Sequence, residues 1–216
     1  VADLYSDELQ SILEHSSVLQ IEALESNKSL ESMPEYVTYL VNNQVRKNDI
    51  LIAVGGGIIQ DITCFLAATL LRGLSWFFYP TTLLAQADSC IGSKSSINCG
   101  DSKNLIGTFT PPKKVIIGNN FLETLSDKDV RSGVGEMLKV HAISGEKAFD
   151  YISSRYNQIC TDKSTMQAFI RHSLEIKKEY IELDEFDEGV RNIFNYGHSL
   201  GHAIEAATNF LIPHGI

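Results

Sequence analysis

The sequence predicts an α/β protein in which a parallel, doubly wound sheet is followed by an all-helical region. In the first half, short apolar runs alternate with segments of helical periodicity. A run of three glycines, Gly55–Gly57, joins one such strand to the next helix. After about residue 122 helical patterns continue without a further strand-like run. We therefore predict two domains, residues 1–124 and 125–216. A chain of 216 residues is long enough for two small domains.

Helices are predicted where apolar residues recur every three or four positions. Leu9, Ile12 and Leu13, for example, share one face of the first such segment. In the second, Ser32 is a suitable N-cap and Pro34 falls in the first turn, where proline is tolerated. The predicted helices cover residues 3–15, 32–45, 58–71, 127–143, 146–156, 163–183 and 189–208.

Strands are predicted at short apolar runs that end in glycine or proline. The run at 49–54 is almost entirely apolar, as expected for a strand buried on both faces of a sheet. The run at 76–79 is aromatic and is stopped by Pro80. The predicted strands cover residues 18–21, 49–54, 76–79 and 114–117.

Composition excludes some classes of function. A formal net charge of −9 argues against a general nucleic-acid binder, which needs cations to neutralise phosphates. No apolar run is long enough to span a bilayer, and no membrane association is predicted. The four cysteines form no C-x-x-C pair, which favours reduced thiols and a cytoplasmic protein.

Three of the six histidines fall near the end of the sequence: His198, His202 and His214. On a helix, His198 and His202 stand four positions apart and project from one face. His214 follows after about one loop. This pattern is typical of a divalent metal site or a proton-transfer site. An ordinary, partly buried histidine pair is an equally good interpretation of this stretch alone.

Phosphate binding is indicated upstream. Glycines after a strand let the backbone approach a ligand, and the amides at the following helix N-terminus favour a pyrophosphate. Asp61 stands one turn into that helix, and Thr81 and Thr82 follow the next strand. Further along, a polar cluster suits a phosphate or carboxylate; its members are Lys94, Asn98, Lys103 and Asn104. A tight turn and a solvated loop are the structural alternatives.

Taken in order, these motifs resemble the 3-dehydroquinate synthase family. The resemblance rests on Gly55-Gly56-Gly57-x-x-x-Asp61, Arg72-Gly73, Pro80-Thr81-Thr82 with Gln86-x-Asp88, Gly92-x-Lys94, Lys103-Asn104-x-Ile106-Gly107, Gly135-Glu136-x-x-Lys139, Arg191-x-x-x-Asn195-x-Gly197-His198-x-x-Gly201-His202-Ala203-Ile204-Glu205, and His214-Gly215. It runs from about Glu25 to Gly215. It implies a Rossmann-like nucleotide-binding domain followed by a helical metal-binding domain. It also implies that the first strands and the last helices lie outside this sequence.

The resemblance implies NAD and a divalent metal, usually zinc, with cobalt as the substitute. It implies conversion of DAHP, a seven-carbon keto-acid sugar phosphate, into 3-dehydroquinate with loss of phosphate, a lyase reaction of the shikimate pathway. The implied metal ligands are Glu136, His198 and His214. The implied catalytic residues are Asp88, Lys139, Lys177, Asn195 and His202. Substrate binding falls to Arg72, Lys94, Asn104 and Arg191. NAD binding falls to Glu25, Lys28, Gly55, Gly56, Gly57, Asp61, Thr81, Thr82 and Lys103. Arg72 would reach the substrate phosphate of a neighbouring subunit, so a homodimer is expected.

Some positions depart from the family pattern. Gln60 and Cys64 stand where glycine is usual, and Ser93 replaces the glycine before Lys94. A sister sugar-phosphate cyclase, making valiolone-type or inosose-type rings, is therefore the first alternative. Arg191 and Asn195 favour dehydroquinate. An iron-type polyol dehydrogenase shares the glycine turn and the histidines but gives no reason for so many lysines. A binding module with a structural zinc is disfavoured, since such sites usually have four protein ligands.

Overall fold

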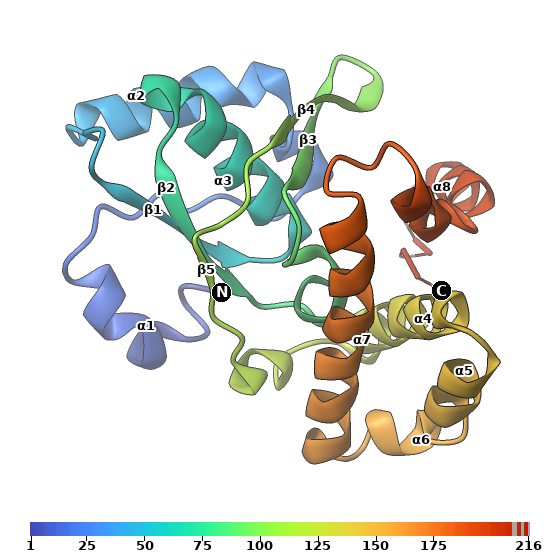
Figure 1. Cartoon of the computed structure of the whole chain (residues 1–216). Coiled ribbons are helices and arrows are strands. Elements are labelled where there is room, and N and C mark those ends of the chain that lie inside the picture. Colours follow the sequence, from blue (N-terminus) through green and yellow to red (C-terminus); the bar gives the residue numbers. More distant parts are fainter. Residues whose placement is uncertain (209–210, 213, 216) are drawn as a thin grey trace. The chain divides into compact units, whose positions relative to one another are not determined.

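The computed structural model describes residues 1–208, 211–212 and 214–215 of the chain (Figure 1). The chain divides into two compact units. Unit 1 comprises Val1–Thr81 and Ser93–Gly118, and unit 2 comprises Thr82–Gly92 and Asn119–Ile216. The α/β class predicted from the sequence is confirmed. The domain limits 1–124 and 125–216 differ from these units chiefly at residues 82–92, and they stay a prediction.

Unit 1 is built on a parallel sheet of three strands in the order β1-β2-β5. Strand β1 is Ile50–Gly55, β2 is Ser75–Pro80 and β5 is Lys114–Val115. Helix α3, Gly57–Thr69, connects β1 to β2, as parallel neighbours require. Helix α1 is Ser6–Leu13 and α2 is Met33–Asn42. These bounds confirm the predicted helices and all but one of the predicted strands of this unit.

The core of unit 1 lies where α2 and α3 meet the sheet region. Met33 and Tyr36 of α2 pack with Ile62 and Leu66 of α3 and with Ile97. All five side chains are buried. At the end of β1, a Cβ on Gly55 would lie 2.6 Å from Ile59 Cγ1. Glycine is therefore required there for α3 to pack closely against the strand that precedes it.

The strand predicted at residues 18–21 is wrong. Among the described residues this segment joins no ladder; Leu19 and Ile21 pack against the unit 1 core as an extended chain. The Val18 carbonyl accepts a hydrogen bond from the Tyr39 hydroxyl at 2.7 Å. In a strand, this carbonyl would instead accept from a backbone N–H. The prediction that β1 is buried on both faces is also wrong. Ile50 and Ile52 are 46% and 39% exposed.

An antiparallel hairpin was not predicted. Strand β3, Lys94–Cys99, pairs with β4, Ser102–Phe109, through a tight turn at Gly100. The register shifts between Ile97 and Cys99. The strands are rich in serine, lysine and asparagine, so apolar alternation gave little signal. The polar cluster read from the sequence thus lies on an ordered hairpin rather than a loop.

Unit 2 is helical, as predicted. Its helices are α4 (Asp127–Ser144), α5 (Glu146–Ser153), α6 (Tyr156–Ile159), α7 (Lys163–Leu183) and α8 (His198–Ala207). Side chains of Ser126 and Asp162 cap α4 and α7 by accepting backbone hydrogen bonds. A short π-helical turn, Ala85–Ser89 (η4), packs against both α4 and α7. The core includes Leu83, Val134, Met137, Phe169 and Ile170.

One predicted helix of unit 2 is wrong in its extent. The predicted helix 189–208 is interrupted: Val190–Asn195 forms a 3-10 segment (η6), and α8 begins only at His198. Gly197, with φ of +81°, makes the break. This backbone conformation is easily adopted by glycine and disfavoured for residues with a Cβ. The break puts His198 in the first turn of α8 and leaves His198 and His202 on one helix, as predicted.

A pair of histidines, of which His141 is buried, links α4 to α7. The His141 ring is fully buried, with Nδ1 2.7 Å from the Met137 carbonyl oxygen and Nε2 2.8 Å from His172 Nδ1. If Nδ1–H of His141 donates to the carbonyl, its Nε2 accepts from His172. The His141 ring is then neutral. Burial lowers the pKa of His141, and His172 contributes in the same direction.

Because of this pair, we expect the stability of unit 2 to decrease in acid. Because the folded pKa of His141 is lowered, its neutral form contributes stability that is present above the unfolded value, about 6.5. This stability is lost as the pH falls from there toward the folded value. We expect the urea concentration at the midpoint of unfolding to decrease as the pH is lowered from 7.5 to 5. The decrease should be smaller in His141→Gln. An equal fall in both proteins would contradict the assignment.

Candidate active site

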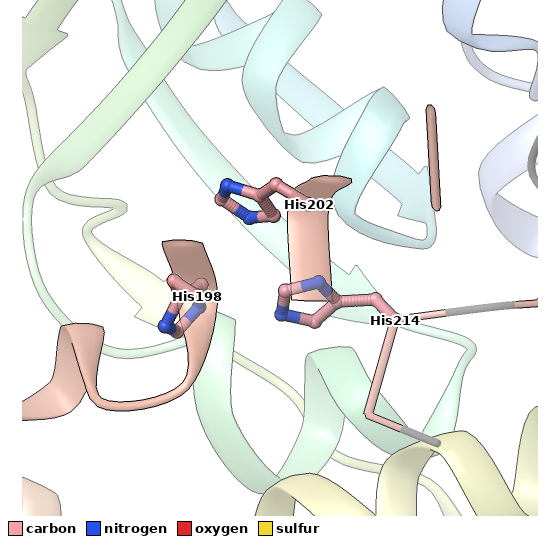
Figure 2. A group of neighbouring side chains, drawn as sticks. All are labelled: His198, His202 and His214. Atoms are coloured by element: carbon pink, nitrogen blue, oxygen red, sulfur yellow. The ribbon is translucent and has the colours of Figure 1, made fainter. Parts of the chain in front are cut away.

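The described residues of unit 2 bring His198, His202 and His214 together (Figure 2). One ring nitrogen of each lies within 4.8 Å of one from each of the others. The ring centroids are 5.0 Å apart for His198 and His202, and 5.0 Å for His198 and His214. Helix α8 supplies the first two rings, and the segment after it supplies the third. The geometry favours the metal interpretation over an ordinary histidine pair.

The surroundings of His198 fit a cation ligand. Its Nδ1 is buried and has no hydrogen-bond partner among the described residues. A buried, unsatisfied nitrogen is costly, and a bound metal ion would satisfy it. Burial lowers the pKa of His198, and the Lys139 ammonium adds to the effect. The ring is therefore held neutral, the form that coordinates metals.

Glu136 and Lys139 lie one turn apart on α4 beside the histidines. The buried Glu136 carboxylate is ion-paired through Oε1 with Lys139, and its Oε2 is 3.8 Å from His214 Nε2. Lys139 also donates to the Phe194 carbonyl at 2.9 Å. Glu136 thus has one oxygen directed at the histidine cluster. A carboxylate and imidazoles form a ligand set that zinc accepts.

A second buried ion pair connects η4 with α7. Lys177 Nζ is 2.8 Å from both the carboxylate and the carbonyl oxygen of Asp88. Burial alone would raise the pKa of Asp88, but Lys177 and then Lys139 hold the pKa below its usual range. Asp88 is therefore held as a carboxylate by its pairing with Lys177. The neighbouring Cys90 is no nucleophile, because burial raises its thiol pKa to about 12.

Arg191 and Asn195 lie on η6, and they differ in exposure. Arg191 is buried; its Nη1 donates to the Glu185 carbonyl at 2.5 Å. A Cβ on Gly92 would come within 2.9 Å of its Nη2, so glycine leaves room for the guanidinium. Asn195 is exposed and donates to Asn192 at 3.3 Å. Both lie in unit 2 with Asp88, Lys139, Lys177 and the histidines.

In unit 1 the glycine turn has the geometry that suits a phosphate. Gly56 is the N-cap of α3, and the amides of its first turn lack partners within the helix. A Cβ on Gly57 would meet no atom within 4 Å, so the space beside the turn is open. Thr81, at the end of β2, is buried and donates its backbone N–H to the Gly55 carbonyl at 2.9 Å. Thr82 belongs to unit 2, where its hydroxyl accepts from the Ala85 amide.

The buried Lys28 contacts three other predicted site residues of unit 1. Lys28 Nζ lies 3.1 Å from Asp61 Oδ2 and donates to Asn104 Oδ1 at 2.8 Å, with Glu25 Oε1 at 3.5 Å. Burial raises the pKa of Asp61, against the opposing effect of Lys28. Asn98 completes the network: its amide donates to Glu25, and its oxygen accepts from the Asn104 backbone. Asn98 was predicted only as a member of the polar cluster, and this network with Glu25 and Asn104 was not predicted.

Three further cations of unit 1 were predicted as site residues. Lys94 begins β3, and Lys103 is exposed in β4. Arg72 is exposed in a turn where Leu71, Arg72 and Gly73 all have positive φ. Lys47 Nζ stabilises this turn by donating to all three of their carbonyl oxygens. Leu71 and Arg72 are not glycines, so their positive φ angles cost conformational energy. Backbone strain of this kind concentrates at functional sites.

Comparison with known families explains why these residues occur together. Residues 18–132 match the model for the N-terminal part of 3-dehydroquinate synthase, and residues 133–216 match the model for its C-terminal part. The chain belongs to the 3-dehydroquinate synthase family. Two curated members illustrate the similarity. The 3-dehydroquinate synthase of Clostridium tetani is 42% identical over 192 residues, which are 88% of this chain and 52% of that protein. That of Pelagibacter ubique is 41% identical over 96% of this chain and 57% of its own length.

Solved structures show the same family fold. The 2-epi-5-epi-valiolone synthase ValA of Streptomyces hygroscopicus subsp. jinggangensis, with NAD+ and Zn2+ bound, is 26% identical and has a TM-score of 0.89. The match covers 100% of this chain and 62% of that one. A 2-deoxy-scyllo-inosose synthase with carbaglucose-6-phosphate, NAD+ and Co2+ is 25% identical, with a TM-score of 0.86 over 99% and 58% of the two chains. The chain thus spans little more than half of these dehydroquinate synthase family members and structural relatives. No helix among its described residues is both long and apolar enough to cross a membrane.

Proposed function

We propose that the protein to which this chain belongs is a 3-dehydroquinate synthase, which cyclises DAHP to 3-dehydroquinate with loss of phosphate. The observation that carries the proposal is the family match over residues 18–216. The charged set of unit 2 supports it, because a phosphorylated keto acid needs both cations and a metal. A lyase of the shikimate pathway, acting in the cytoplasm, follows as part of the same proposal.

The proposed metal ligands are Glu136, His198 and His214, with His202 facing the substrate. The unsatisfied His198 nitrogen and the Glu136 oxygen directed at His214 support this set. Two imidazoles and a carboxylate leave positions open for substrate oxygens. The similar structures hold Zn2+ or Co2+. Zinc is proposed as the resident ion, with cobalt as a working substitute.

The proposed NAD site lies in unit 1. The open glycine turn at the start of α3 is suited to the pyrophosphate. Glu25, Lys28 and Asp61 form a connected polar group that suits ribose hydroxyls. Thr81, Thr82 and Lys103 are proposed to complete the site. Both ValA and the inosose synthase structure contain NAD+.

The chain's own residues would bind, orient and exchange protons with the substrate. When bound, NAD supplies reversible hydride acceptance and the divalent ion supplies polarisation of a substrate oxygen. Asp88, as a carboxylate, can accept the proton of a substrate hydroxyl. Lys139, Lys177, Asn195 and His202 would stabilise negative charge and hold the leaving phosphate. Lys94, Asn104 and Arg191 are proposed to orient the substrate, with Arg191 at its carboxylate.

A homodimer is part of the proposal. Arg72 is exposed, and its side chain forms no hydrogen bond or ion pair with the residues that the structure describes. The strained turn that presents it is held by Lys47. A guanidinium displayed in this way suits the phosphate of a substrate bound by a second copy of the chain.

The second candidate is a sister sugar-phosphate cyclase. The high TM-scores to a valiolone synthase and an inosose synthase favour it. A phosphate-release assay with DAHP, sedoheptulose 7-phosphate and glucose 6-phosphate separates the two. We expect release from DAHP, at least 10-fold weaker in Arg191→Met because the buried guanidinium is lost. An Arg171→Met control, at an exposed arginine of α7, should match the unmodified protein. Release only from one of the other sugars would move the protein to the sister branch.

A further inference from the structure

We propose that Glu205 is a positioning residue for His214 and fixes the ring so that its Nε2 faces the metal. This inference rests on the metal site proposed above and adds a residue to which no role has been given. The carboxylate Oε1 of Glu205 lies 2.6 Å from His214 Nδ1. Its side chain is only 15% exposed, so the interaction is little weakened by solvent.

The placement of Glu205 follows from α8. Glu205 stands seven residues after His198 and three after His202, so all three project from one side of the helix. His214 comes from the segment beyond α8 and has no helical turn of its own to fix its ring. The hydrogen bond to Glu205 supplies this constraint. It joins the later segment back to the helix that carries the other histidines.

The direction of this hydrogen bond determines what His214 offers to a cation. An ionised carboxylate can only accept, so Nδ1 must carry the proton. In the neutral ring Nε2 then carries the lone pair, and it is this nitrogen that lies 3.8 Å from Glu136 Oε2. A carboxylate behind a ligating imidazole also increases its basicity. Glu205 therefore selects the tautomer and the orientation in which His214 can share a metal with Glu136.

Metal affinity of the protein stripped of metal provides the first test. Zinc binding is measured by competition with a chromophoric chelator in the unmodified protein, Glu205→Gln and Glu205→Ala. Loss of such a partner typically costs about 10–100-fold in affinity. We expect the full loss in Glu205→Ala and a smaller one in Glu205→Gln, which keeps an acceptor but not the charge. Glu175→Gln is the matched control, because that glutamate pairs with Arg171 on the surface of α7.

The tautomer of the His214 ring provides a second test. It would not change if Glu205 only stabilised the fold. In metal-free protein, the ¹⁵N shifts of the His214 ring should show a protonated Nδ1, and Glu205→Ala should shift the ring toward a mixture of tautomers. Unchanged zinc affinity and tautomer in a folded Glu205→Ala, with affinity lost in His214→Ala, would overturn the inference and leave the metal site standing. Unchanged affinity in His214→Ala as well would show that the metal site itself is wrong, and the inference would fall with it.

Discussion

Alanine at His198 or His214 is expected to abolish zinc binding and phosphate release together. Each change removes a proposed ligand, so the loss in affinity should exceed the about 10–100-fold cost of losing an outer partner. His202→Ala is expected to keep the metal but lower turnover by about 10²–10⁴-fold, the range for a lost acid or base. Bound zinc is measured per chain after dialysis, beside turnover. His15→Ala, at an exposed histidine of unit 1, is the control.

The comparison of these variants also decides which residues hold the ion. A ring nitrogen of each histidine lies within 4.8 Å of one from each of the others, so His202 has the reach to coordinate a metal. If His202→Ala loses zinc while Glu136→Gln keeps it, three histidines bind the ion and the proposed set is wrong. If His198→Ala and His214→Ala both retain zinc, the cluster is not a metal site.

Lys177→Met is expected to be the most destabilising single change in unit 2. It leaves the buried Asp88 carboxylate without its nearest cation, which typically costs about 3–5 kcal/mol. The pKa of Asp88 should rise, since Lys177 is the largest influence that lowers it. Chemical denaturation at neutral pH measures the free energy of unfolding. Turnover should fall as well, because Lys177 is also proposed to contact substrate.

A paired variant separates the two effects. Asp88→Asn with Lys177→Met removes both charges and should recover most of the stability without recovering activity. Lys178→Met, at an exposed lysine that pairs with Glu182, should change the stability by less than about 1 kcal/mol. Equal stability of Lys177→Met and Lys178→Met would show that the buried ion pair contributes nothing.

Strong local signals predicted the regular elements well. Helix α7, Lys163–Leu183, has the bounds expected from its apolar spacing, and β2 was expected from its aromatic run. The hairpin β3–β4 was missed because its strands are rich in polar residues and lack the apolar alternation that indicates a strand. The segment 18–21 looked like a strand, but a strand needs a partner, and these apolar residues pack against helices instead.

In the candidate site, too, local spacing was predicted correctly and tertiary contacts were not. The i, i+4 spacing predicted that His198 and His202 share a helix, and the structure confirms it. Spacing alone could not place Glu136 beside His214, because tertiary packing brings α4 to that segment. Nor could it show that Lys28 joins Asp61 and Asn104, which are 33 and 76 positions away. The role of Glu205 was missed although its helical phase with His198 was readable in the sequence.

The ratio of phosphate released to NAD supplied tests the central claim most directly. The protein is given zinc, a limiting amount of NAD and an excess of DAHP, and both phosphate and NADH are followed. A cyclase that recycles its cofactor should release many phosphates per NAD with no net accumulation of NADH. Formation of one NADH per turnover, or NADH without phosphate release, would identify a dehydrogenase and contradict the account.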